Sequence, residues 1–157
     1  MKAKFEEAVS TGDLESVRFL ISKMPGEILN CLDDYGRSVL FAAIVNGFSE
    51  IVYELCLSGL NVNIHDKNGK TPLHFAAIYK QFDCTKILID FGAHVNATDV
   101  NGNTPLFDAI FNSGGDTNIL LLLKSNGADY LSKNKYGVSP KDLADTIGNF
   151  DVSYLFD

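Results

Sequence analysis

The sequence has little of what membrane-spanning or secreted proteins usually carry. No apolar run approaches the roughly 20 residues that cross a bilayer, and residues 1–12 contain no apolar signal-peptide core. The three cysteines, Cys31, Cys56 and Cys84, are odd in number and show no CxxC spacing, so we predict reduced and mostly buried thiols. We therefore expect a cytoplasmic protein without a membrane partner.

Basic residues are also scarce. The chain has 13 Lys and Arg against 20 Asp and Glu, which gives a formal net charge of −7. Because binding to a nucleic-acid backbone requires a basic stripe, no nucleic-acid partner is expected. The acidic balance permits a basic protein partner, although an acidic surface is also a common route to solubility.

Motifs of catalysis and cofactor binding are missing as well. The sequence contains no GxSxG, HExxH, P-loop or GxGxxG pattern, and the lone Gly114-Gly115 pair is far weaker than a phosphate-binding loop. The histidines, His65, His74 and His94, fall at three different places of the repeat described next, which favours structural roles over the alternative of a metal site. We therefore predict that the protein is not an enzyme and that it has no metal site and no cofactor.

The chain does contain an internal repeat. Turn glycines stand at Gly36, Gly69, Gly102 and Gly137, at intervals of 33, 33 and 35 residues. Three residues before each glycine stands a residue that can accept backbone N–H bonds in a turn. These residues are Asp33, Asp66, Asp99 and Asn134.

The most regular unit predicts a pair of short helices. Thr71-Pro72 is typical of a helix start, since threonine can cap free N–H groups and proline suits the first helical position. A second helix is expected over residues 84–90, and Gly92 ends it in the left-handed conformation. The unit is turn, helix, helix, return.

The stretch Thr71-Pro72-Leu73-His74, with Ala76 two residues later and a period of 33, resembles the ankyrin repeat signature. The alternative is that periodic apolar residues merely mark generic helices. The resemblance implies an all-α ankyrin repeat solenoid, in which stacked helix-turn-helix units are joined by β-hairpin-like turns. It also implies that His74 forms a hydrogen bond that ties neighbouring turns together.

The resemblance divides residues 1–157, as a single ankyrin repeat domain, into an amino-terminal cap (1–32), repeats at 33–65, 66–98 and 99–133, and a carboxy-terminal cap (134–157). Met24-Pro25-Gly26 is predicted to be a loop. The two extra residues of the fourth unit are expected within 112–117. Close helix approach is predicted at Ala43, Ala76, Ala109 and Ala144.

Each repeat departs from the signature in its own way. Ser38-Val39 replaces Thr-Pro, so the first helix of that repeat should start less sharply. Phe41 and Phe107 stand where His74 stands in the third unit, and Lys80 replaces the glycine that is usual between the two helices.

In an ankyrin stack, the turn tips and the exposed sides of the first helices line a concave face that binds another protein. The apolar and aromatic residues predicted there favour an interface; the alternative is that half of these side chains pack against adjacent repeats. The predicted binding residues are Tyr35, Arg37, Val45, Asn46, Lys67, Asn68, Lys70, Ile78, Tyr79, Asn101, Asn103, Phe111, Asn112 and Tyr136.

Residues 104–152 look like small bacterial ankyrin proteins that act as immunity partners of secreted toxins. The markers are the Gly114-Gly115 insertion and the stretch from Tyr136 to Pro140. This resemblance implies a protein, monomeric when free, that neutralises a basic toxin domain on its concave face. The alternatives are an adaptor or regulatory subunit that inhibits no toxin, and an accessory domain of a separate enzyme.

Overall fold

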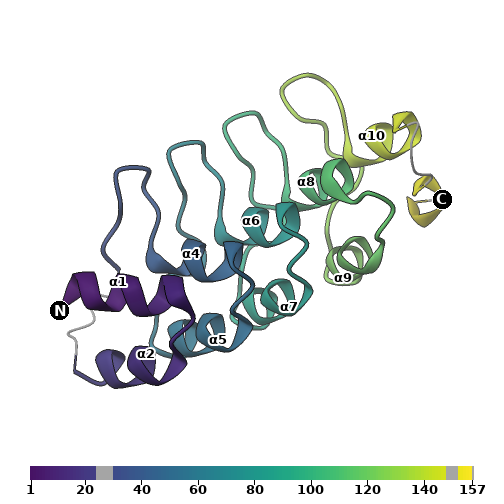
Figure 1. Ribbon diagram of the computed structural model, residues 1–157. Helices are drawn as coiled ribbons and strands as arrows, with labels where there is room; N and C mark the ends of the chain where they lie inside the picture. The colour runs from purple at the N-terminus through teal and green to yellow at the C-terminus, as the bar shows by residue number, and fades with distance from the viewer. Residues whose placement is uncertain (24–29, 148–151, 157) are drawn as a thin grey trace.

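The computed structural model describes residues 1–23, 30–147 and 152–156, which form an elongated stack of helix pairs (Figure 1). One row holds α1, α4, α6, α8 and α10, and the other holds α2, α5, α7 and α9. The turns between successive pairs project from the first row, away from the second. These described residues contain no β-strand, so the predicted all-α repeat solenoid is confirmed.

The helices of the first row are α1 (Lys2–Thr11), α4 (Val39–Val45), α6 (Pro72–Ile78), α8 (Pro105–Asn112) and α10 (Pro140–Thr146). Those of the second row are α2 (Leu14–Ile21), α5 (Ser49–Leu57), α7 (Phe82–Asp90) and α9 (Asn118–Ser125). A 3-10 turn, η1 (Ser153–Phe156), follows the last helix. The predicted loop at Met24-Pro25-Gly26 and part of the carboxy-terminal cap, residues 148–151, lie outside the described residues.

The helix starts of the first row follow from their capping residues. The hydroxyls of Thr71, Thr104 and Ser139 each accept the backbone N–H three residues on, and a proline occupies the first turn. Helix α4 begins at Val39, 33 residues before Pro72, so the missing proline does not shift its start. Instead, the Ser38 hydroxyl forms no cap bond within the described chain.

Small residues bring the first-row helices together. Ala43, Ala76, Ala109 and Ala144 are 0–3 % exposed, as their recurrence at one helix position predicts. Each helix pair can bury this small-residue side only against its neighbours, so the stack is stabilised by interfaces between repeats.

Glycines follow the first-row helices α1 and α4, whereas a lysine follows α6. Gly12 and Gly47 follow α1 and α4 with φ of 79° and 73°. At the corresponding place after α6 stands Lys80, which adopts φ of 56° and is the non-glycine residue with positive φ among those described. A side chain in this left-handed region carries a small conformational strain.

The last helix pair is covered by the carboxy-terminal turn. Phe156 is buried, and its ring centroid lies 5.4 Å from that of Tyr130. The Lys124 ammonium of α9 lies 5.5 Å from both ring centroids and donates a hydrogen bond to the carbonyl of Leu155. These contacts close this end of the stack.

Candidate protein-binding face

The turns share one backbone construction. In the turn at 66–70, Asp66 Oδ1 accepts the N–H groups of Asn68 and Lys70, both at 2.9 Å, and Gly69 adopts φ of 75°. A Cβ at Gly69 would lie 2.9 Å from the nitrogen of Val100 in the next turn, so both its φ and its surroundings require glycine. The predicted role of the repeated aspartates is confirmed at all three turns.

Neighbouring turns are also joined to one another through the backbone. Lys67 N donates to Tyr35 O, Val100 N to Asn68 O, and Lys135 N to Asn101 O, each at 2.9 Å. This one-bond ladder sets the spacing between turn tips. We call the four tips (33–37, 66–70, 99–103 and 134–138), together with the exposed sides of α4, α6 and α8, the turn face.

Three predicted binding residues link successive repeats. Arg37 Nη2 lies 3.5 Å from Asp66 Oδ2, and Lys70 Nζ lies 3.0 Å from Asp99 Oδ2. At the same place in the next repeat, Asn103 Oδ1 accepts a 2.8 Å bond from Asn134 Nδ2. Arg37, Lys70 and Asn103 therefore each have at least one polar group engaged within the stack.

Lys70 has a second partner that sequence reasoning missed. Its Nζ lies 2.5 Å from Oδ2 of Asp108, a buried residue on α8. Burial raises the pKa of Asp108 against the opposing effect of Lys70. Burial also acts on Asp99, but hydrogen bonds from Asn103 and Lys70 outweigh it and lower the pKa of that carboxyl. Since burial lowers the pKa of Lys70 less than the two carboxylates raise it, the lysine stays charged.

His74 performs the role that the repeat signature implies. Its Nδ1 accepts the backbone N–H of Thr71 at 3.0 Å, and its Nε2 donates to the carbonyl of Asn103 in the next turn, also at 3.0 Å. The ring is fully buried, and burial lowers its pKa to about 4. The neutral ring therefore ties the third repeat to the fourth.

Aromatic side chains form an array across the turn face. The Arg37 guanidinium lies 5.2 Å from the Tyr35 ring centroid and 5.0 Å from that of Phe75. Phe75 in turn stacks on Tyr79, with centroids 6.2 Å apart and an 18° angle between ring planes. Sequence reasoning missed Phe75, although its position holds Ala42 one repeat earlier and is therefore not set by the framework.

The other predicted residues divide into exposed and engaged groups. Tyr35, Tyr79, Phe111 and Tyr136 have exposed fractions of 47–73 %. Val45 and Ile78 are half-buried, and Val45 packs against the core. The alternative that some of the predicted side chains pack within the stack therefore holds for part of the set.

The amides of the turn face mostly fold back on the protein. Asn46 and Asn112 donate to carbonyls of their own helices, and Asn101 Oδ1 accepts the Tyr136 hydroxyl at 3.2 Å. Lys67 and Asn68 lie exposed at their turn tip.

Comparison with known proteins agrees with this geometry. A family model described as ankyrin repeats (3 copies) matches residues 40–134. The chain belongs to the ankyrin repeat family.

Several ankyrin relatives match different shares of the chain. A Saccharomyces cerevisiae protein named probable 26S proteasome regulatory subunit p28 is 33 % identical over 141 residues, 89 % of this chain and 61 % of its own. Mouse protein phosphatase 1 regulatory subunit 12A is 38 % identical over 55 residues, and a Fowlpox virus ankyrin repeat protein is 36 % identical over 62. These two matches cover 35 % and 40 % of this chain, but only 5 % and 14 % of the relatives.

Charge is distributed unevenly over this ankyrin stack. The exposed tips carry Lys67 and Lys135 beside Asp33 and Asp34. Exposed carboxylates instead lie on helices outside the turn face: Glu6, Glu7, Glu15, Glu50, Asp83 and Asp90. The excess negative charge can therefore attract a basic partner at long range, but it does not line the turn face.

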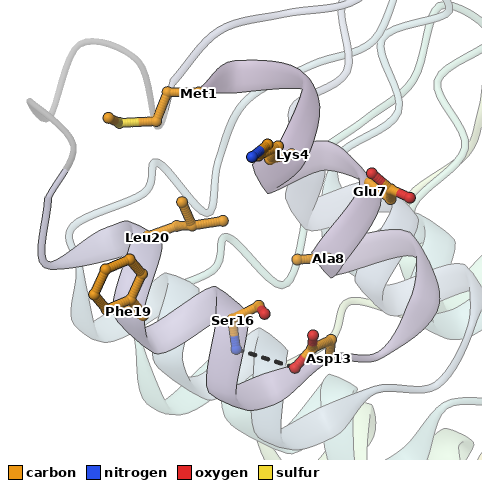
Figure 2. A pocket seen from close by; sticks show the side chains of 8 residues that line it. All are labelled: Met1, Lys4, Glu7, Ala8, Asp13, Ser16, Phe19 and Leu20. Atoms are coloured by element: carbon orange, nitrogen blue, oxygen red, sulfur yellow. Dashed lines mark hydrogen bonds between the residues drawn. The ribbon is translucent and has the colours of Figure 1, made fainter.

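The amino-terminal ankyrin unit carries a hollow of about 580 Å³ between α1 and α2 (Figure 2). Met1 and Phe19, both more than 60 % exposed, lie at its rim, and Lys4 and Glu7 of α1 also line it. Asp13 caps α2 by accepting the N–H of Ser16 at 3.0 Å. The surface of the amino-terminal cap thus includes an apolar part.

The described parts of the chain contain neither a candidate metal-ligand cluster nor a helix that could span a bilayer. Residues 1–23, 30–147 and 152–156 contain no cluster of three His, Cys, Asp or Glu placed to hold a metal ion. No helix within those ranges is long and apolar enough to span a bilayer. The free Cys56 and Cys84 are buried, and burial raises their pKa values to about 12 and about 11, as expected for unreactive thiols.

Proposed function

We propose that this chain is a non-catalytic protein-binding module whose turn face docks on another protein. The observation that carries the proposal is a row of exposed aromatic rings: Tyr35 and Tyr136 lie on turn tips held by a backbone ladder, and Tyr79 and Phe111 lie at α6 and α8. Tyrosine is a common hot-spot residue, and clustered exposed apolar groups mark interaction sites. A pre-ordered surface also loses less entropy on binding.

The test removes two central rings. Wild type and Tyr79→Ala/Phe111→Ala would each be used as bait in a pull-down from the native host, and the captured proteins identified by mass spectrometry. The affinity of each protein that wild type captures and the variant does not would then be measured for both by calorimetry. Truncating a central anchor typically costs at least about 2 kcal/mol, so the affinity should fall more than about tenfold. Leu57→Ala/Leu121→Ala is the matched control, since these exposed apolar residues lie on α5 and α9 in the other row.

The control variant should bind as wild type does, and both variants should retain a normal circular dichroism spectrum. If Tyr79→Ala/Phe111→Ala binds with unchanged affinity while the control loses affinity, the binding site lies on the second-row helices and the turn-face proposal is wrong.

The narrower proposal is an immunity protein that binds and neutralises a cognate secreted toxin. Its support is the resemblance of residues 104–152 to such proteins and the net charge of −7, which suits a basic toxin. The competing function is a regulatory subunit or adaptor, which is favoured by two relatives named as regulatory subunits.

A protection assay separates these two functions. A gene for a large secreted toxin directly upstream would identify the toxin to express. An immunity protein should rescue cells that express this toxin, and Tyr79→Ala/Phe111→Ala should fail to rescue them. Absence of rescue by a well-expressed wild type would exclude immunity against that toxin and favour the regulatory function.

A further inference from the structure

A hollow of about 270 Å³ lies at the foot of the turn at 33–37, against α4, on the turn face. Its apolar walls are Phe41, Val45 and Phe75; the rings of Phe41 and Phe75 meet edge to face, with centroids 5.0 Å apart. Its polar lining includes Asp33, Arg37 and Ser38. The hollow is therefore shaped by two repeats and mixes aromatic walls with hydrogen-bonding groups.

Two residues that line the hollow each have a buried polar atom without a hydrogen-bond partner among the residues that the structure describes. These atoms are Nε of Arg37 and the hydroxyl oxygen of Ser38, a residue only 6 % exposed. One repeat later, the equivalent Thr71 hydroxyl pairs with His74 Nδ1 at 2.9 Å. Phe41 occupies the equivalent histidine position and offers no nitrogen, which explains why Ser38 lacks this bond.

Arg37 cannot readily turn away to satisfy its Nε. Its Nη2 lies 3.5 Å from Asp66, and its guanidinium lies 5.2 Å from the Tyr35 ring centroid and 5.0 Å from that of Phe75. A buried donor without a partner destabilises the protein, and a ligand with a matching acceptor would offset that cost on binding.

The required group is a neutral acceptor that also carries a donor. Arg37 Nε can only donate, so an ammonium would leave it unpaired. A carboxylate would accept its bond, but Asp66 already lies 3.5 Å from Nη2 and Asp33 lines the hollow, so another negative charge would be repelled. A carboxamide avoids both problems: its oxygen can accept from Arg37, and its NH₂ can donate to Ser38 or Asp33.

We propose that this hollow receives the side-chain carboxamide of a glutamine or asparagine from the partner protein. The proposal rests on the proposed function, because it assigns partner chemistry to one part of the turn face. A side chain is favoured over a main-chain carbonyl because the hollow lies at the foot of the turn, with α4 residues in its wall.

The test uses a small probe and the intact chain. Capped glutamine (N-acetyl-glutamine methylamide) is titrated into ¹⁵N-labelled protein, and the side-chain Nε–H signals of arginine are followed by NMR. Arg18 and Arg37 are the two arginines of the sequence, and Arg18 Nε is already bonded to Glu54 at 2.8 Å on other helices. Arg18 is therefore an internal control, and Arg37→Lys assigns the signals.

Capped glutamine should shift the Arg37 signal, leave the Arg18 signal in place, and bind about three- to tenfold more tightly than capped leucine, which carries the same main-chain amides. Capped glutamate and capped lysine should bind no better than capped leucine. Ser38→Ala, which removes one hydrogen-bond partner, should weaken glutamine binding about threefold while the melting temperature is retained.

Equal binding of glutamine and leucine would overturn the proposal in favour of a main-chain ligand, and preferential binding of glutamate or lysine would overturn it in favour of a charged ligand. Because the probe requires no partner, these outcomes are distinct from failure of the turn-face proposal, which is measured with Tyr79→Ala/Phe111→Ala and the partner itself.

Discussion

His74 stands where the neighbouring repeats carry Phe41 and Phe107, and the structure explains what the ring nitrogens add. Nδ1 accepts from Thr71, while Nε2 donates across to Asn103. A second proton would have to sit on Nδ1, opposite an N–H donor and inside the core. For this reason the folded state strongly favours the neutral ring.

We predict that His74→Phe removes a pH dependence of stability. The folded-state pKa is about 4 against an ordinary 6.5, so between these values the unfolded chain binds the proton and the folded chain does not. When the pH falls from 7 to 5, this residue should lower the free energy of unfolding of wild type by about 2 kcal/mol. Above pH 7 the contribution of this residue should not change with pH. Urea unfolding at the two pH values measures it. Equal losses for wild type and variant would contradict the assignment.

Capping hydroxyls offer a second comparison between equivalent residues. Thr71 accepts the N–H of His74 and contacts the His74 ring, whereas Ser38 is buried without either bond in the described chain. We predict that Thr71→Ala costs about 1–2 kcal/mol and that Ser38→Ala costs less than about 0.5 kcal/mol. Chemical denaturation of the two variants checks this, and equal costs would show that Ser38 does cap α4.

At the scale of elements, ion pairs join the turns and helices of successive repeats. Lys70, on the turn before α6, reaches Asp99 on the next turn and Asp108 on α8. One ammonium therefore holds two carboxylates of the following repeat, both of them buried. Arg37 makes a single, longer contact to Asp66 in the preceding interface.

We predict that Lys70→Met destabilises the stack by about 3 kcal/mol, because removal of one partner leaves buried carboxylates unpaired. The double variant Lys70→Met/Asp108→Leu should recover part of that loss, since it also removes one of the two charges. A double-mutant cycle by urea unfolding measures the coupling. A cost below about 1 kcal/mol would mean that the cluster behaves as an ordinary surface ion pair.

At the scale of the whole molecule, the chain is a one-dimensional stack in which each repeat contacts its neighbours. Helix α6 packs between α4 and α8, and α7 between α5 and α9. A defect in the third unit therefore disrupts interfaces on both sides.

Ala76→Asp should unfold the central stack. Ala76 is fully buried, and the substitution places an unpaired charge between helices at a cost of several kcal/mol. Thermal melts followed by circular dichroism test it, with Lys86→Asp on the exposed side of α7 as control. A midpoint within about 3 °C of wild type would contradict the stacking described here.

The sequence by itself determined the repeat length, the helix starts and the turn construction. These features rest on interactions within about four residues, such as Asp66 with Asn68 and Lys70, or Thr71 with His74. Chain geometry brings such partners together in every copy, so composition at fixed spacing predicts them. The recurring alanines belong to the same class, because only a small residue allows close helix approach.

The tertiary structure decided which turn-face side chains remain free. Arg37, Lys70 and Asn103 were predicted to face a partner, but their polar groups meet residues 29 to 38 positions away. Phe75 and Asp108 occupy the same repeat position and still have different partners, an arginine and a lysine. Such contacts depend on the spacing and rotation between adjacent repeats, which the packed interface sets and a single repeat does not encode.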